Sequence, residues 1–281
     1  MSNRKMPQAE LAAKPGVKSD VQPSVLMRWN PDIRAATKDD DENTISILDI
    51  IGQDWFGDGV TAKRIRAALR SIGKNDVTVL INSPGGDFFE GLAIYNLLRD
   101  HPAQVTVKIM GMAASAASVI AMAGDDIQIA RAGFLMIHNV WVIALGDKND
   151  LREVADWLEP FDESAIDIYA ARSGMKVDEL RAMMDKETWI GGSKAIEMNL
   201  ADELLPADQV DSKAKQSADA KFIKAEKQFD RICASINFSV AQRRELMQAL
   251  RGDKPGAVTT GKQDAAVAQG LEGILELARS I

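Results

Sequence analysis

Between residues 45 and 138, short and almost wholly apolar segments alternate with longer segments of helical pattern. This alternation constrains the fold more than any other feature of the chain. The apolar segments lie at 45–51, 77–82, 105–110, 127–130 and 134–138. Strands that alternate with helices are typical of a parallel sheet built through right-handed crossovers. The sequence therefore predicts an α/β domain, which we place at residues 44–206.

The two flanking regions differ from this domain in composition. Residues 1–43 mix Pro, Lys, Asp and small residues and end in an acidic run, so we expect a flexible N-terminal arm. Its short apolar patch, Val25, Leu26, Met27 and Trp29, is a candidate docking patch. Residues 207–281 hold few large apolar side chains, and we expect a helical or partly disordered C-terminal extension. Two roles remain possible for this extension: a partly ordered tail, or a segment that binds an assembly or scaffold partner.

Charge and cysteine content narrow the class of protein. The net charge of −7 argues against a general nucleic-acid binder. The one cysteine, Cys233, excludes an internal disulfide framework and suits a cytoplasmic setting. The polar first sixteen residues lack the apolar run of a signal peptide. The longest apolar-rich stretch, 109–124, is interrupted by Gly and Ser residues, so we expect no membrane span.

Polar features follow three of the predicted strands. The turn SPGG occupies 83–86, Ser115 follows the third strand, and His138 ends the strand FLMIH. Because the carboxyl ends of parallel strands meet at one edge of a sheet, these features are expected to lie together. A serine that begins a helix of small residues lies beside free backbone N–H groups, which suits an oxyanion of acyl transfer. The simpler alternative for Ser115 is a helix cap.

Two other residues compete for these roles. Ser118 lies one turn inside the same predicted helix, and we expect it to be buried. The chain has only two histidines, and the other one, His101, lies in the connector RDHPAQ between a helix and a strand. Such a connector usually lies on the surface, so His138 is the better candidate for a catalytic base. From its position at a strand end alone, a structural role for His138 would be the simpler interpretation.

Three segments resemble the signature blocks of the Clp protease proteolytic subunit, in the same order and at similar spacings. They read LINSPGGDFFEGLAIYNLL, VTVKIMGMAASAASVIAMAG and FLMIHNV. The resemblance covers about residues 45–206 and implies a Clp protease/crotonase-like fold of repeated ββα units. It also implies a serine endopeptidase with Ser115 as nucleophile, His138 as base, and the amides of Gly86 and Ala116 as oxyanion donors. No cofactor and no metal are implied, and a homo-oligomer is expected.

The acidic member of the implied Ser-His-acid triad is less well defined. Aligning NLAD at 199–202 with the family pattern places Glu187 at the position, where the family has an aspartate. A glutamate can also orient an imidazole. Asp185 is the second candidate, and the third alternative is that neither residue is the acid of the triad.

Some features resemble the phage-encoded head maturation proteases of this family. They are the segment GQDWFGDGVTA, the ETW segment, the long flanking regions, and a loop after His138 without the usual Gln-Pro. This resemblance implies capsid and scaffold proteins as substrates, within a procapsid in the host cytoplasm. A non-enzymatic capsid scaffold protein that retains the fold and a crotonase-type acyl-CoA enzyme are the alternatives.

Overall fold

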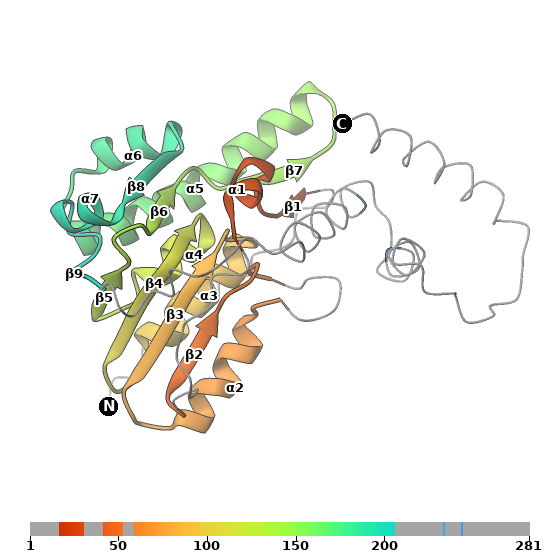
Figure 1. Cartoon of the computed structure of the whole chain (residues 1–281). Helices are drawn as coiled ribbons and strands as arrows, with labels where there is room; N and C mark the ends of the chain where they lie inside the picture. The colour runs from red at the N-terminus through yellow and green to blue at the C-terminus, as the bar shows by residue number, and fades with distance from the viewer. Residues whose placement is uncertain (1–16, 31–41, 53–58, 206–232, 234–242, 244–281) are drawn as a thin grey trace, which may run out of the picture. The chain divides into compact units, whose positions relative to one another are not determined.

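The computed structural model describes residues 17–30, 42–52 and 59–205, together with Cys233 and Arg243 (Figure 1). The chain divides into two compact units, Met1–Asn237 and Phe238–Ile281. All described residues except Arg243 belong to the first unit, which is the one discussed below. The C-terminal extension expected at 207–281 therefore lies almost entirely outside the described residues.

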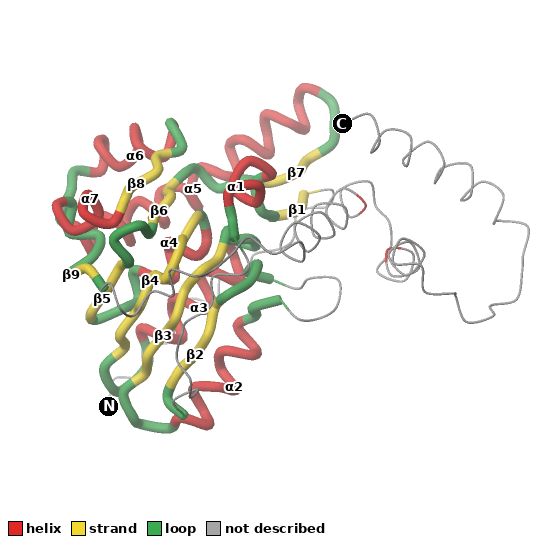
Figure 2. Tube along the Cα trace, in the orientation of Figure 1, coloured by secondary structure: helices red, strands yellow, loops and turns green. Residues whose placement is uncertain are grey.

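Helices and strands alternate along most of the described chain (Figure 2). The strands are β1 (Val17–Ser19), β2 (Thr44–Ile47), β3 (Val77–Ser83), β4 (Val105–Ala114), β5 (Asp126–Ile129), β6 (Phe134–Ile137), β7 (Val142–Ala144), β8 (Thr188–Gly191) and β9 (Glu203–Leu204). The helices are α1 (Pro23–Arg28), α2 (Ala62–Ile72), α3 (Phe88–Arg99), α4 (Ala116–Ala121), α5 (Lys148–Ser173), α6 (Val177–Asp185) and α7 (Gly192–Glu197).

The main sheet has seven strands and is mostly parallel. Strands β2, β3, β4, β5 and β9 are neighbours in that order, and all four pairings are parallel. The long strand β4 pairs first with β5 and then, nearer its carboxyl end, with β6. Strand β8 closes that end of the sheet as an antiparallel partner of β6. The expected α/β class with a parallel sheet is confirmed.

The core lies between the sheet and helices α2 to α5. Alternate residues of a strand point to the same face, and on this face β3 and β4 contribute Val77, Val79, Ile81, Val105, Val107 and Ile109. Each of these side chains is at most 1% exposed. Burial of such β-branched side chains contributes about 1.5–3 kcal/mol each, which holds the strands in register up to the ends where the polar features lie.

Helix α5 runs without interruption through Pro160, although a proline inside a helix usually kinks or breaks it. Asp147 caps its first turn and Gly174, at φ 73°, ends it. A proline removes one backbone hydrogen bond, but the next two turns bury Ala165, Ile166 and Tyr169 against the core and hold the helix in place.

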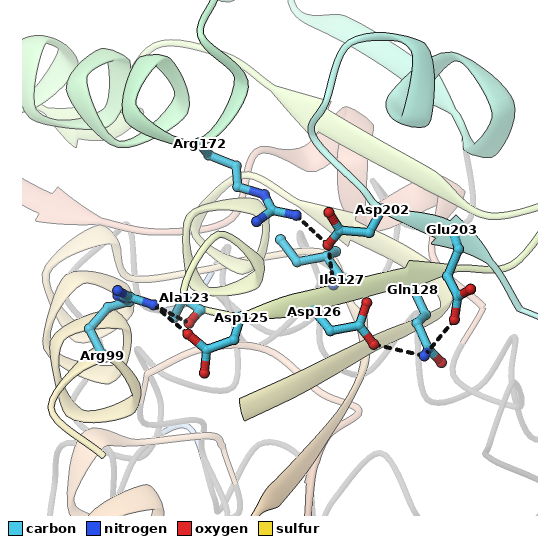
Figure 3. A network of polar contacts seen from close by, with 9 residues as sticks. All are labelled: Arg99, Ala123, Asp125, Asp126, Ile127, Gln128, Arg172, Asp202 and Glu203. Carbon is cyan, nitrogen blue, oxygen red and sulfur yellow. Dashed lines mark hydrogen bonds and ion pairs between the residues drawn. The ribbon is translucent and has the colours of Figure 1, made fainter. Parts of the chain in front are cut away.

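A polar network ties α5 to strands β5 and β9 (Figure 3). The carboxylate of Asp202 accepts hydrogen bonds from the Arg172 guanidinium and from the backbone N–H of Ile127. On β5 itself, the amide of Gln128 donates to Glu203 on β9 over 2.8 Å. The network fixes the carboxyl end of α5 relative to the edge of the sheet.

Four strands were not predicted, because each is short and finds its partner far away in sequence. The loop after His138 contains β7, which pairs antiparallel with β1. Strand β8 pairs with β6 more than fifty residues earlier, and β9 pairs with β5. Patterns of two to four residues are too short for a periodicity to show. In the described part of the chain, no helix combines the length and apolarity needed to cross a bilayer.

Residues 17–30 differ from the flexible arm expected at 1–43. They form β1 and α1, and Val25, Leu26 and Trp29 are at most 2% exposed. The Trp29 indole N–H donates to the backbone oxygen of Asn82 over 3.0 Å, at the end of β3. The candidate docking patch packs on the chain's own sheet instead of a partner, because burial there removes these large side chains from water. Met27, the fourth member of the patch, is 67% exposed.

Candidate active site

The ends of strands β3, β4 and β6 converge at one edge of the sheet. In the parallel registers Ser83 lies beside Ala113, and Ala114 lies beside Met136. The N–H of Ser115 donates to the carbonyl of Met136 over 2.9 Å. The SPGG turn, Ser115 and His138 therefore meet where the sequence predicted.

Ser115 and His138 form a direct hydrogen bond. The distance between Ser115 Oγ and His138 Nε2 is 2.7 Å. Donation by the hydroxyl requires Nε2 to be unprotonated, so the ring proton then lies on Nδ1. Burial lowers the pKa of His138 to about 4, and the charge of Glu187 opposes this shift. At neutral pH the imidazole is therefore uncharged, which is the form that can accept a proton.

The backbone at Ser115 has an unusual conformation, with φ 55° and ψ −126°. Among the described non-glycine residues, only Ser115, Glu187 and Asn199 have positive φ. Such conformations cost on the order of 1–3 kcal/mol and are concentrated at functional sites. Two of the three residues are ones that the sequence analysis singled out for catalysis.

The glycine turn lies directly against Ser115. A Cβ atom at Gly85 would lie 2.5 Å from the carbonyl oxygen of Ala114 and 2.7 Å from Cβ of Ser115. At Gly86 it would lie 2.0 Å from the carbonyl oxygen of Ile51. Both glycines also have positive φ, so no other residue fits either position without moving the nucleophile's surroundings.

Two backbone N–H groups beside Ser115 are available to a ligand. The neighbouring groups are paired: the N–H of Asp87 donates to Ile51, and the N–H of Ile51 donates to Gly85. Within the described residues, the N–H groups of Gly86 and Ala116 have no such acceptor. Because buried N–H groups are nearly always paired, these two are suited to receive an oxygen atom from outside the chain.

The two candidate acids differ in their relation to His138. Glu187 accepts hydrogen bonds from Gln22 over 2.9 Å and from the indole of Trp189 over 3.2 Å. Neither bond is to His138, but the charge of Glu187 raises the pKa of that histidine. Asp185 is exposed and accepts a bond from Asn139 over 2.9 Å. Of the two, Glu187 is the acid coupled to His138.

A buried hydroxyl pair behind the nucleophile was not predicted. Ser118 Oγ donates to the carbonyl of Ser115 over 2.6 Å and lies 2.8 Å from the hydroxyl of Tyr169. Because the Ser118 proton is used, Tyr169 is the donor to Ser118. Burial raises the pKa of Tyr169 above its usual range, so this hydroxyl stays protonated. The predicted burial of Ser118 is confirmed.

His101 lies apart from this site. Its Nε2 atom is 2.8 Å from the carbonyl oxygen of Asn75, in the connectors that precede β3 and β4 at the opposite end of the sheet. Among the described residues, no three His, Cys, Asp or Glu side chains gather as a metal site requires.

A small cavity adjoins the Ser115–His138 pair. Its free volume is about 10 Å³, and its lining includes Asp20, Gly86 and Trp141. A single water molecule needs about 10–15 Å³ measured in this way. The cavity itself has room for about one water molecule. Asp20 comes from the N-terminal segment, which the sequence did not connect with the site.

Comparison with known proteins gives the same assignment as the motifs. The family model described as Clp protease matches residues 57–208, more than half of the chain. The ATP-dependent Clp protease proteolytic subunit of Bacteroides fragilis is 30% identical over 154 residues, which are 53% of this chain and 74% of that protein. Subunit 3 from Rhodococcus jostii is 30% identical over 135 residues, 47% of this chain and 66% of that protein.

The corresponding subunit of Deinococcus radiodurans is 28% identical over 137 residues, again 47% of this chain and 66% of that protein. The residues that the family model matches include the three strand ends that converge at the site. The chain belongs to the Clp protease family of serine peptidases.

Proposed function

We propose that the chain is an endopeptidase in which Ser115 is the nucleophile and His138 the general base. The observation that carries this proposal is the 2.7 Å hydrogen bond between Ser115 Oγ and His138 Nε2. A serine hydroxyl is a weak nucleophile until an adjacent base accepts its proton. The neutral imidazole has its unprotonated nitrogen directed at that hydroxyl, so the pair is ready to react before a substrate binds.

The reaction follows from this geometry. Ser115 Oγ bonds to the peptide carbonyl carbon while its proton passes to His138 Nε2. The carbonyl oxygen becomes an oxyanion and accepts hydrogen bonds from the N–H groups of Gly86 and Ala116. His138 then gives its proton to the leaving amine as the C–N bond breaks. A water molecule, deprotonated by His138, cleaves the acyl-enzyme and restores the hydroxyl of Ser115. Removing one oxyanion donor typically lowers kcat about 100- to 1,000-fold.

Glu187 has the role of the acid in this proposal. His138 carries a positive charge in the transition state, and the nearby carboxylate stabilises that charge. Its influence on the pKa of His138 supports this role. Since its hydrogen bonds go to Gln22 and Trp189, we assign it as a positioning and electrostatic group rather than as a direct partner of Nδ1.

A fluorophosphonate probe tests the assignment. The full chain should gain one adduct, at Ser115, and both Ser115→Ala and His138→Ala should abolish it. Glu187→Gln should lower the second-order labelling rate, whereas the matched variant Asp185→Asn should leave it near that of the parent. A folded chain that gains no adduct would contradict the catalytic assignment and favour a scaffold protein that retains the fold. Equal effects of the two acid variants would remove Glu187 from the site.

For the biological role, we propose a head maturation protease that cleaves capsid and scaffold proteins. The support is the loop after His138, which reads NVWVIALGD without Gln-Pro, together with the GQDWFGDGVTA and ETW segments. A proteolytic subunit of a general ATP-dependent protease is the other candidate, since the matched relatives carry that name.

Terminal mapping of proteins in particle-producing cells separates these two roles. Cells with the parent chain should contain shortened shell proteins with new N-termini, and cells with Ser115→Ala should retain the full-length forms. If shell proteins are identical in both and purified chain degrades unfolded proteins only with an ATPase, the maturation role is refuted. Light scattering of the purified chain tests the homo-oligomer that we expect.

A further inference from the structure

The N-terminal segment runs alongside the candidate active site. Strand β1 pairs antiparallel with β7, the short strand that follows His138, and the two lie side by side in Figure 1. In the register Val17 lies opposite Ala144, and Ser19 lies opposite Val142. A segment more than 120 residues earlier in sequence thus occupies the edge of the strand that leads away from the catalytic base.

The last residue of β1 and the residues after it contact three parts of the site. Ser19 Oγ accepts a hydrogen bond from the N–H of Phe88, two residues after Gly86, over 3.0 Å. Asp20 lines the cavity that adjoins Ser115 and His138. Gln22 donates to the Glu187 carboxylate over 2.9 Å. Residues 17–22 therefore pass from β7, across the cavity, to the acid behind the base.

An apolar anchor holds the segment there. Val21 is 2% exposed and packs in one cluster with residues of α1, β4 and β6. At the end of β3, the carbonyl of Asn82 accepts a bond from the Trp29 indole over 3.0 Å, and the side-chain amide of Asn82 donates to the carbonyl of Asn30 over 2.8 Å. Because the anchor begins at Val21, residues 17–20 remain attached near the site even when their own contacts open.

This arrangement places the chain's own segment where a substrate strand could pair. A peptidase holds its substrate as an extended chain, and an exposed strand edge binds such a chain through main-chain hydrogen bonds. Here one edge of β7 is paired with β1, and Asp20 lines the cavity beside Ser115. A peptide that pairs with this edge of β7 therefore needs residues 17–20 to leave.

We propose that residues 17–20 are an intramolecular ligand of the substrate cleft and compete with peptide substrates for it. The inference rests on the proposed function of Ser115 and His138. It also defines the class of substrate: an extended peptide that runs antiparallel to β7 and presents a small polar and then an acidic side chain, as Ser19 and Asp20 do.

A binding experiment tests this without any catalysis. In a Ser115→Ala background, we compare the full chain with two deletions, of residues 2–16 and of residues 2–20. The shorter deletion is the matched control, because it leaves β1 in place. The probe is a fluorescent peptide with the sequence of residues 14–22, KPGVKSDVQ, and a scrambled peptide is its control. Anisotropy reports binding.

The deletion of 2–20 should bind the probe roughly tenfold or more tightly than the other two chains, because a tethered ligand acts at an effective concentration near millimolar. Equal affinities in the three chains would overturn the proposal. Should the deletion of 2–20 fail to fold, the full chain with Ser19→Pro replaces it, since proline breaks the β1 pairing and leaves the Val21 anchor.

Labelling of Ser115 by the fluorophosphonate is the second measurement, made without the Ser115→Ala change. The deletion of 2–20 should be labelled at least several-fold faster than the deletion of 2–16, and unlabelled KPGVKSDVQ should slow it competitively. Peptide binding without labelling in any chain would refute the catalytic assignment and leave the intramolecular ligand intact. Labelling at one rate in all chains would refute the intramolecular ligand and leave the catalytic assignment intact.

Discussion

Replacing Tyr169 by Phe removes one hydroxyl from behind the nucleophile, and its effect can be worked out from two distances. Tyr169 donates to Ser118 over 2.8 Å, and Ser118 donates to the carbonyl of Ser115 over 2.6 Å. Loss of the first bond should lower the free energy of unfolding by about 1 kcal/mol. Ser118→Ala leaves the buried tyrosine hydroxyl without its acceptor, at about 1–3 kcal/mol, whereas the Ser115 carbonyl keeps the backbone N–H groups of Ser118 and Val119.

The double variant should be less damaging than the sum of the two single variants. Once Ser118 is Ala, removing the tyrosine hydroxyl also removes an unpaired buried donor, so the second change becomes nearly neutral. We expect a coupling energy of about 1 kcal/mol or more between the two positions. Urea unfolding followed by tryptophan fluorescence measures all four chains, because none of the changes involves a tryptophan.

The labelling rate of Ser115 gives a second readout that stability alone would not move. If the pair positions the Ser115 backbone, Ser118→Ala should lower the rate under conditions where the variant is fully folded. Additive stability effects, within about 0.5 kcal/mol, together with a parental labelling rate in every variant, would refute the reasoning that the two hydroxyls act as one unit on the nucleophile.

Three further predictions concern other parts of the site. In NMR titration the His138 ring should show a pKa of about 4, and Glu187→Gln should lower it further by removing a favourable negative charge; a value near 6.5 would contradict the burial. Because the unfolded chain binds this proton below pH 6.5 and the folded chain only near pH 4, acid titration should remove about 3 kcal/mol of stability across that window. Gly85→Ala should lower Ser115 labelling roughly a hundredfold through its clash with the strand end, whereas Gly73→Ala, whose Cβ meets nothing within 4 Å, should show only backbone strain in a melting curve and keep the rate. Trp29→Ala should lower the free energy of unfolding by about 3–5 kcal/mol, and a change below 1 kcal/mol in urea titration would show that residues 17–30 are not docked.

The sequence predicted the sheet and the meeting of Ser115 with His138 because both follow from local patterns. Near-continuous apolar strands define β3 and β4, and the parallel arrangement brings their carboxyl ends together. The proposed acid was harder to place, since Glu187 lies between the end of α6 and the beginning of β8 and affects the pKa of His138 without a hydrogen bond to it. Its position depends on the antiparallel pairing of β8 with β6, which no local sequence pattern predicts.

The N-terminal segment was misread for a related reason. Its Pro, Lys and Asp content is typical of a flexible arm, and its few large apolar residues carry the whole docking interaction. The overall composition of the segment hides this, because burial of Trp29 and a few aliphatic side chains decides where the segment lies. The pairing of β1 with β7 spans more than 120 residues, so only the folded chain brings it about.

Helix α5 has a consequence for how the nucleophile and the base stay aligned. Tyr169 reaches Ser115 through Ser118, and Asp162, about two turns earlier, accepts a bond of 2.6 Å from the N–H of Val140, two residues after His138. One helix thus contacts the segments that carry both reacting groups. A change that shifts α5 should therefore move serine and histidine in the same direction and leave their separation nearly unchanged.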